Sequence, residues 1–259
     1  MCLILFAHDC HPRYQLVVAA NRDEFYKRPA YPAAFWKEHP QILAGKDAKE
    51  GGTWMGVTAE GRFAALTNYR APASFKAGAP SRGNLVIDFL KSQHEPASFI
   101  KMMDKGGEAY NGFNLLLGNY ASLYYYSNRE KLLRKVEKGI HGLSNSLLDV
   151  SWPKVTKGRE RLAAILKKDS FIVEEVFGMM MDREQVNDSD LPSTGVSLEM
   201  ERWLSPAFIT SQEYGTRVTT VITASRQNHI RFWERSFDPQ QISKYNEVYY
   251  EFEIRGQRA

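Results

Sequence analysis

The sequence predicts an α+β fold in which antiparallel strands and helices are segregated along the chain. Apolar, β-branched and aromatic runs come in pairs that flank short turns, near the N-terminus and again near the C-terminus. Helical spacing of apolar residues is concentrated in the middle of the chain. This order differs from the regular alternation of strand and helix that builds a parallel sheet, so antiparallel sheet with separate helices is favoured.

The predicted elements follow from these patterns in chain order. The first hairpin pairs residues 3–7 with 14–20 across a turn near 9–12. Further strands are expected at 53–58, 62–68, 113–117, 122–127, 218–223, 230–235 and 248–254. Helices are expected at 84–92, 97–104, 152–168 and 171–181. Segments 71–83 and 187–195 are rich in turn formers and are predicted to be loops.

The predicted helix at 152–168 has a recognisable start and a basic face. Trp152-Pro153 is a suitable start, because proline is tolerated in the first helical turn. Its basic side chains Lys154, Lys157, Arg161 and Lys168 are expected to form a solvated outer face. No stretch resembles a linker or a repeat, so residues 1–259 are expected to form a single domain.

Composition excludes several functional classes. A net charge of +4 is too small to indicate nucleic-acid binding, and no apolar run approaches the ~18 residues of a membrane span. The 2 cysteines cannot form a disulfide scaffold, so a reducing, cytoplasmic setting is expected. His8, Cys10 and His11 lie in a tight turn without further ligands, and no nucleotide-binding glycine loop is present. We therefore expect no metal and no cofactor.

Cys2 is the first candidate for chemistry. Removal of Met1 would leave a cysteine that carries a free α-amine. Because the thiol and amine pKa values, about 8.5 and ~7.7–8.0, are close, the amine can take the thiol proton. The alternative is that Cys2 is a small apolar residue at a strand start.

Hairpin geometry brings polar residues toward Cys2. If the first turn is centred near residues 10–11, Cys2 falls opposite about Ala19, and Asn21-Arg22-Asp23-Glu24 leaves the strand beside it. Arg22 would then favour the thiolate and Asp23 would anchor the α-amine. As strand neighbours, the two side chains are expected on opposite faces. The competing interpretation is a solvated strand exit with a surface ion pair.

A series of motifs, in order from position 2 to 236, resembles the NRDE family, which includes the transport and Golgi organization protein 2 proteins. After Cys2 and the Asn21-Arg22-Asp23-Glu24 segment, the series is Glu50-Gly51-Gly52-Thr53-Trp54-Met55-Gly56, Ala65-Leu66-Thr67-Asn68-Tyr69, Ser81-Arg82-Gly83, Tyr110-Asn111-Gly112-Phe113-Asn114, Gly142-Leu143-Ser144-Asn145, Tyr214-Gly215-Thr216-Arg217 and Glu234-Arg235-Ser236. The resemblance implies the four-layer αββα sandwich of the N-terminal nucleophile hydrolases, with two antiparallel sheets.

The resemblance also implies roles for particular residues. Cys2 would be the nucleophile and Asp23 its nearby carboxylate; Asn68 and Asn145 would hold the oxyanion, and either Arg22 or Arg217 would be the functional arginine. Fixed amide donors of this kind contribute roughly 3–4 kcal/mol each to transition-state stabilisation. Further ligand contacts are expected from Asn21, Glu24, Gly52, Trp54, Tyr69 and Asn114.

Two functions compete on this reading. The first is a cysteine amidohydrolase that cleaves a linear, non-peptide amide or a thioester. The second is a non-catalytic binding or trafficking protein for an acyl-CoA, lipid or haem-like ligand on the same fold, with an apolar pocket lined by Trp54, Tyr69 and Phe113. A scaffold for protein partners is a third interpretation, and it requires a large exposed apolar patch.

Overall fold

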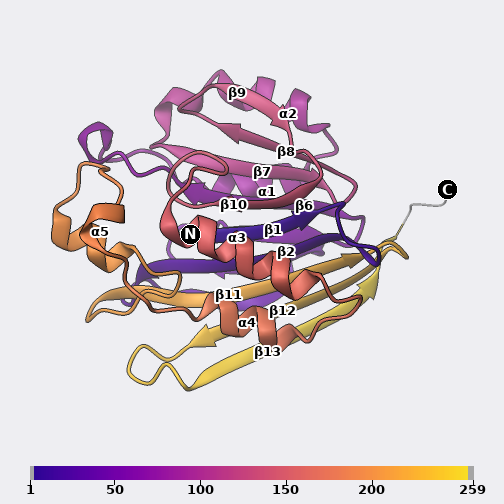
Figure 1. Ribbon diagram of the computed structural model, residues 1–259. Coiled ribbons are helices and arrows are strands. Elements are labelled where there is room, and N and C mark those ends of the chain that lie inside the picture. Colours follow the sequence, from indigo (N-terminus) through magenta and orange to yellow (C-terminus); the bar gives the residue numbers. More distant parts are fainter. Residues whose placement is uncertain (1–2, 256–259) are drawn as a thin grey trace.

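The computed structural model describes residues 3–255 and arranges them as two antiparallel sheets flanked by helices (Figure 1). Sheet A has the strand order β10-β1-β2-β11-β12-β13, and sheet B has the order β3-β4-β5-β6-β7-β8-β9. The strands of sheet A are β1 Leu3–His8, β2 Tyr14–Phe25, β10 Gly139–Leu143, β11 Tyr214–Ser225, β12 His229–Phe237 and β13 Tyr245–Glu253.

Sheet B is a meander in which each strand pairs with the next one along the chain. Its strands are β3 Ala30–Trp36, β4 His39–Asp47, β5 Met55–Thr58, β6 Arg62–Asn68, β7 Phe113–Asn119, β8 Ser122–Ser127 and β9 Leu132–Lys135. The helices are α1 Gly83–Lys91, α2 Pro96–Asp104, α3 Pro153–Leu166, α4 Val173–Met180 and α5 Leu198–Leu204, with short 3-10 turns at Pro72–Ser74, Gly107–Ala109 and Asp188–Asp190. Within residues 3–255, no helix is long and apolar enough to cross a membrane.

The two sheets and the two groups of helices form four layers, and an apolar cluster lies between each neighbouring pair. One cluster lies between the two sheets and takes Ile4 and Phe6 from sheet A and Val57 and Phe63 from sheet B. A second joins sheet B to α1 and α2, and a third joins sheet A to α3 and α4, which lie in front of that sheet in Figure 1. The αββα sandwich expected from the motif series is confirmed.

Strand alternation explains why both faces of sheet A are apolar. Along β1, Leu3 and Leu5 pack on the helical layer, whereas Ile4 and Phe6 pack between the sheets. A strand covered on both faces therefore reads as a continuous apolar run, as residues 3–7 do.

The predicted register of the first hairpin is wrong. Ala7 pairs with Val17, and Leu5 lies opposite Ala19. The connection is wider than a tight turn because buried His11 is anchored in it: its Nε2 lies 3.1 Å from the Lys168 carbonyl oxygen, and its Nδ1 accepts the Arg13 N–H. These contacts occupy residues that a short hairpin would place in the strands.

The end of β2 also differs from the expectation. Asn21-Arg22-Asp23-Glu24 does not leave the sheet after residue 20, because β2 continues to Phe25. On its other side β2 pairs with β11 from Tyr14–Ser225 to Phe25–Tyr214, which supplies backbone partners for the whole polar segment. The four polar residues are thus strand residues with defined faces.

Sequence patterns found most of the other strands and four helices within a few residues, but they missed β3, β4, β9, β10 and α5. The β3 strand contains Pro32 and lies at the edge of sheet B with an irregular register against β4. Extending the predicted hairpin of residues 53–58 and 62–68 would place Asn68 opposite about Gly52, but the ladder stops before that pair. Pairing of β5 with β6 ends at Met55–Ala65, and Asn68 pairs with Phe113 of β7.

A buried carboxylate links the two sheets. Glu234 on β12 is 1% exposed; it accepts the Ala33 N–H of β3 at 2.7 Å and the Thr220 hydroxyl of β11 at 3.1 Å. Burial raises the pKa of Glu234 to about 7, although these two hydrogen bonds and the charge of Arg22 favour the ionised form. The inter-sheet layer therefore contains a group that titrates near neutrality.

We expect stability to fall as the pH rises through the pKa of Glu234. The folded-state pKa of about 7 lies above the ordinary value of 4.5, so the folded protein binds this proton more tightly. The stabilisation is complete below pH 4.5 and is lost by about pH 8, a loss of about 3 kcal/mol. Urea unfolding at pH 4.5 and at pH 8 measures this loss of stability. Glu234→Gln is the matched control and should flatten this part of the profile; an unchanged slope in that variant would assign the pH dependence to other groups.

Candidate functional site

The predicted site residues gather at the end of sheet A where β1 begins. On one side of β1, Leu3 pairs with Asn21, so β2 brings Arg22 and Asp23 to this end. On the other side, Ile4 pairs with Leu143, and the chain continues directly into Ser144 and Asn145. Cys2, the predicted nucleophile, precedes Leu3 in the sequence and lies outside the described residues.

Arg22 is a buried cation that connects the two sheets. Its side chain leaves β2 toward sheet B, its guanidinium carbon lies 4.4 Å from the centre of the Trp54 ring, and Nη2 donates to Asp47 Oδ2 at 3.1 Å. A carboxylate oxygen of Glu24 lies 3.9 Å away. The residue is 3% exposed, and burial lowers its pKa, an effect that the charges of Glu24 and Asp47 oppose.

Asp47 is held ionised by several donors. Arg28 Nε donates to Oδ2 at 2.7 Å, and the backbone N–H groups of Lys49 and Glu50 donate to Oδ1 at 3.1 and 3.0 Å. Burial disfavours the charged carboxylate, but these hydrogen bonds and the two arginines hold the pKa of Asp47 below its usual range. The ion pair with Arg22 is therefore maintained at neutral pH.

Asn21 and Asp23 lie on the opposite face of β2, as the alternation of strand side chains predicted. Asn21 Nδ2 donates to the carbonyl oxygens of Met180 and Ala207 at 2.9 and 2.7 Å, and its Oδ1 accepts the Thr219 hydroxyl at 2.6 Å. Asp23 Oδ1 accepts the Thr216 hydroxyl at 2.5 Å. The side chains of Arg22 and Asp23 therefore lie on different sides of sheet A. The hydrogen bond from Asn21 to Met180 joins the end of α4 to β2.

Arg217 is engaged with the backbone. It lies at a register shift between Thr216 and Val218, where its Nη1 donates to three carbonyl oxygens, those of Phe25, Tyr26 and Arg28, at 3.2, 3.1 and 2.9 Å. These contacts close the turn that leads from β2 into β3 and thereby place Arg28 beside Asp47.

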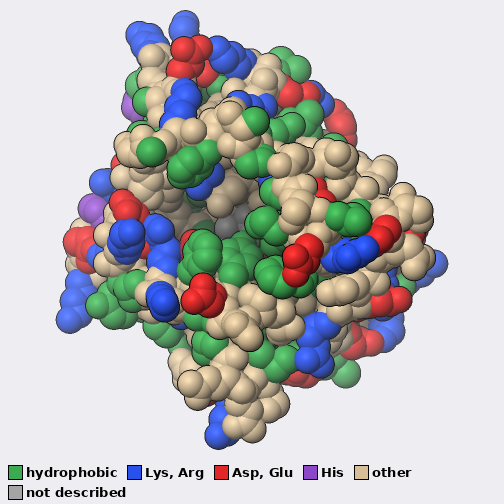
Figure 2. All heavy atoms as spheres, turned by 90° about the vertical axis from the view of Figure 1, so that its left-hand side faces the viewer, with side chains coloured by type: hydrophobic (Ala, Val, Ile, Leu, Met, Phe, Trp, Pro, Cys, Tyr) green, Lys and Arg blue, Asp and Glu red, His purple; other side chains and the backbone are tan. Residues whose placement is uncertain are grey.

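Several of the remaining predicted residues line one of two pockets. The first, here called the arginine pocket, has a volume of about 260 Å³ and is lined by Arg22, Glu24, Trp54 and Asn68 together with the loop before α1. The second, here called the tryptophan pocket, has a volume of about 600 Å³ and is lined by Trp152, Asn145, Tyr69 and the segment before α5. Figure 2 looks onto the side of the molecule on which α5 lies and shows a hollow ringed by hydrophobic side chains.

A hydrogen bond connects the two asparagines predicted to hold an oxyanion. Asn145 Nδ2 donates to the backbone oxygen of Asn68 at 2.9 Å, and the Arg70 N–H donates to the backbone oxygen of Asn145 at 2.7 Å. Asn145 Oδ1 is buried and has no hydrogen-bond partner among residues 3–255. Asn145 lines the tryptophan pocket and Asn68 lines the arginine pocket, so this hydrogen bond joins residues of the two pockets.

Asn114 and Gly52 have structural contacts. The Asn114 amide donates to Thr67 Oγ1 and to the Ser146 carbonyl at 3.0 and 2.8 Å and accepts the Tyr125 hydroxyl at 2.9 Å. Gly52 lies so close to α1 that a Cβ there would come within 2.6 Å of the Gly83 carbonyl carbon. Gly52, which was expected to contact a ligand, thus instead allows the backbone at the start of α1 to pack closely against it.

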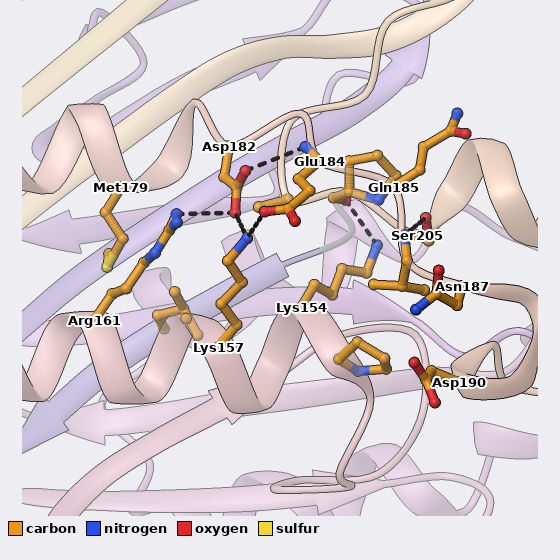
Figure 3. A pocket seen from close by; sticks show the side chains of 16 residues that line it. Lys154, Lys157, Arg161, Met179, Asp182, Glu184, Gln185, Asn187, Asp190 and Ser205 are labelled. Atoms are coloured by element: carbon orange, nitrogen blue, oxygen red, sulfur yellow. Dashed lines mark hydrogen bonds and ion pairs between the residues drawn. The ribbon is translucent and has the colours of Figure 1, made fainter.

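A third pocket lies between α3 and the segment after α4 (Figure 3). Lys157 and Arg161 both point toward Asp182 there, at 2.7 and 2.8 Å. The prediction that Lys154 is solvated is wrong: it is buried, and its Nζ donates to the carbonyl oxygens of Leu204 and Pro206 at 2.6 and 3.4 Å. Lys154 fastens the end of α5 to α3, because buried carbonyl groups need donors.

Sequence patterns missed several pocket residues. Asp47, which pairs with Arg22, is the last residue of β4, and Arg28, which pairs with Asp47, precedes β3; both of these strands escaped prediction. Arg70 and Trp152 line the tryptophan pocket, and the Arg70 guanidinium carbon lies 5.1 Å from the Trp152 ring centre. The signal for Arg70 was its place directly after the Thr67-Asn68-Tyr69 motif. In the part of the chain that is described, no group of three His, Cys, Asp or Glu side chains is placed to bind a metal.

Comparison with known proteins identifies relatives along nearly the whole chain. The family described as "Transport and Golgi organisation 2" matches residues 1–239. A Homo sapiens protein named "Transport and Golgi organization protein 2 homolog" is 33% identical over 99% of this chain and 100% of its own length. A Drosophila melanogaster protein, "Transport and Golgi organization protein 2", is 27% identical over 91% of this chain and 92% of its own length.

Solved structures share the architecture at much lower identity. Two variants of conjugated bile acid hydrolase from Clostridium perfringens superpose with TM-scores of 0.54 and 0.52 at 10% and 11% identity. They cover 96% and 98% of this chain and 92% and 98% of their own. At this identity the likeness shows the fold, which is that of the N-terminal nucleophile hydrolases.

We expect Arg217→Met to destabilise the protein by about 2–3 kcal/mol, because three carbonyl groups lose a charged donor. Arg231→Met is the matched control: Arg231 lies on the neighbouring strand β12 in an exposed pair with Glu251, 2.9 Å away, and its loss should cost less than about 1 kcal/mol. Urea unfolding of both variants measures the difference. Equal losses would mean that the turn after β2 does not depend on Arg217.

Proposed function

The chain belongs to the Transport and Golgi organisation 2 family, and from its fold and the polar residues at the start of β1 we propose that it is a cysteine amidohydrolase of the N-terminal nucleophile type. Its substrate would be a linear, non-peptide amide or a thioester. The observation that carries the proposal is the convergence of β2 and β10 on Leu3, which brings Asp23 and Asn145 to the two sides of the strand that Cys2 precedes.

The proposed reaction uses the chain's own terminus. After removal of Met1, the α-amine of Cys2 takes the thiol proton, and the thiolate attacks the substrate carbonyl carbon. Collapse of the tetrahedral intermediate breaks the carbon–nitrogen or carbon–sulfur bond, the amine returns the proton to the leaving group, and an acyl-thioester remains on Cys2. Water then hydrolyses that thioester and releases the acid.

The surrounding residues supply electrostatics and position. Amide N–H groups of Asn68 and Asn145 would stabilise the negative carbonyl oxygen. Asp23 would hold the α-amine, and the buried charge of Arg22 would favour the thiolate. Glu24, Trp54 and Tyr69 would shape the surrounding walls.

A non-catalytic carrier of an acyl-CoA, lipid or haem-like ligand is the second candidate. The observation in its favour is that the named relatives are described by transport and organisation, and the tryptophan pocket is large enough, at about 600 Å³, to hold an apolar group. Both functions are proposed for the cytoplasm, where a reducing environment keeps the Cys2 thiol free.

We expect a thiol-reactive acyl thioester to label Cys2 at least about tenfold faster than Cys10 at pH 7. The pKa of the exposed Cys10 thiol is raised by desolvation and by Asp9, so Cys10 serves as an internal, unactivated thiol. Intact mass and peptide mapping measure both the loss of Met1 and the site of labelling.

The variants Cys2→Ala and Cys10→Ala separate the candidates. Fast labelling should disappear in Cys2→Ala and persist in Cys10→Ala. Retained Met1 in the native host, or labelling of Cys2 no faster than of Cys10, would eliminate the hydrolase and leave the carrier.

Asn68→Ala should slow acylation of Cys2 by about 10²–10³-fold, because one oxyanion donor is lost. Asn68 lines the arginine pocket and contacts Asn145 through its backbone oxygen, which the substitution preserves. Asn246→Ala, on exposed β13, is the control and should leave the rate unchanged. Stopped-flow acylation with the same thioester measures both; equal rates would remove Asn68 from the oxyanion site.

A further inference from the structure

The arginine pocket contains more positive charge than the proposed acyl transfer uses. Four cationic residues and three acidic residues line it: Arg22, Arg28, Lys76, Arg82, Glu24, Asp47 and Glu50. The acidic groups at its floor are occupied, since Asp47 pairs with both Arg22 and Arg28, and Glu24 lies 3.9 and 3.8 Å from the same two arginines. Outside these pairs the lining contains Lys76 and Arg82 against Glu50, an excess of one positive charge.

Arg22 has an unused donor at this pocket. Its Nη2 is held by Asp47, whereas its Nη1 is buried and has no hydrogen-bond partner in the range 3–255. A buried guanidinium N–H without an acceptor is unfavourable, and proteins pair such groups in nearly every case. An acceptor supplied by a ligand would complete the hydrogen bonding of Arg22.

Helix α1 begins at the same pocket. Ser81, Arg82 and Gly83 line it, and the first turn of this nine-residue helix has no capping side chain and no acidic residue. Contact of Gly52 with Gly83 fixes the helix start against the segment that connects β4 to β5. The N–H groups of Asn84 and Leu85 donate to the Ser81 and Arg82 carbonyl oxygens, so it is the positive end of the helix dipole that favours an anion at this position.

We propose that the arginine pocket binds an anionic group of the substrate, a carboxylate or a phosphate, with Arg22 Nη1 as donor and with the positive end of α1 and the charge of Lys76 in the lining of the same pocket. The proposal rests on the proposed function for what the anion is attached to: an amide or thioester whose reacting carbonyl lies near Asn68, which lines the same pocket. The substrate class is then an acyl compound with a compact anionic end.

Binding of simple anions to the full-length protein tests the site without any turnover. Acetate and inorganic phosphate are the two probes, with sodium chloride at equal ionic strength as reference. We expect saturable amide shifts in nuclear magnetic resonance spectra at Gly52, Gly83 and the Trp54 indole, which lies under Arg22. Tighter binding of acetate assigns a carboxylate, and tighter binding of phosphate assigns a phosphate.

Two variants and a control make the test specific. Arg22→Gln should weaken anion binding by more than about tenfold, and Lys76→Glu by about fivefold, because each places less positive charge at the pocket. Lys76 is exposed on the loop before α1, so its variant tests the site even if Arg22→Gln fails to fold. Lys101→Glu makes the same charge change on exposed α2, away from the pocket, and should bind like the parent protein.

The outcomes separate this proposal from the hydrolase. Shifts that are absent, that follow ionic strength alone, or that are weakened equally by Lys101→Glu would overturn the anion site, whatever the labelling of Cys2. Saturable binding with the expected variant order would support the site even if Cys2 is unreactive, in which case it would belong to a carrier.

Discussion

The arrangement of the whole site depends on the burial of one guanidinium group. Arg22 leaves the central strand of one sheet and is neutralised by Asp47 at the end of a strand in the other. A charge with 3% exposure requires a fixed partner, so the positions of β4, the turn after it and Arg28 are all constrained by this pair.

The sequence carried enough information for the fold class, because its apolar runs and helical periods are local. The register of strand pairs and the strands at the sheet edges were harder to predict from the sequence. Residues 9–15 separate the paired residues of the first hairpin, more than a tight turn needs, because His11 is anchored to the α3–α4 connection, more than 150 residues away in sequence. Strands such as β10, with two glycines and a histidine among five residues, become strands through their pairing with β1 and not through local preference.

The candidate site shows the same limit in its asparagines. Four of them were named as site residues: the resemblance assigned Asn68 and Asn145 to the oxyanion and Asn21 and Asn114 to ligand contacts. In the structure Asn21 and Asn114 use their amides entirely for internal hydrogen bonds, whereas Asn68 lines a pocket and Asn145 keeps one carbonyl oxygen without a partner in the described chain. Only tertiary contacts separate an asparagine that builds the framework from one that is available to a ligand.

The loop between β6 and α1 is fastened at both of its ends. At one end the Arg70 N–H is bound by Asn145, and at the other Gly83 packs on Gly52. The intervening residues line both the arginine and the tryptophan pockets, and Phe75 within them is 72% exposed. Insertions or exchanges in this segment leave the four layers intact, because its ends stay in place. Substitutions in this one segment can thus change what both pockets accept without a change in the layers that support them.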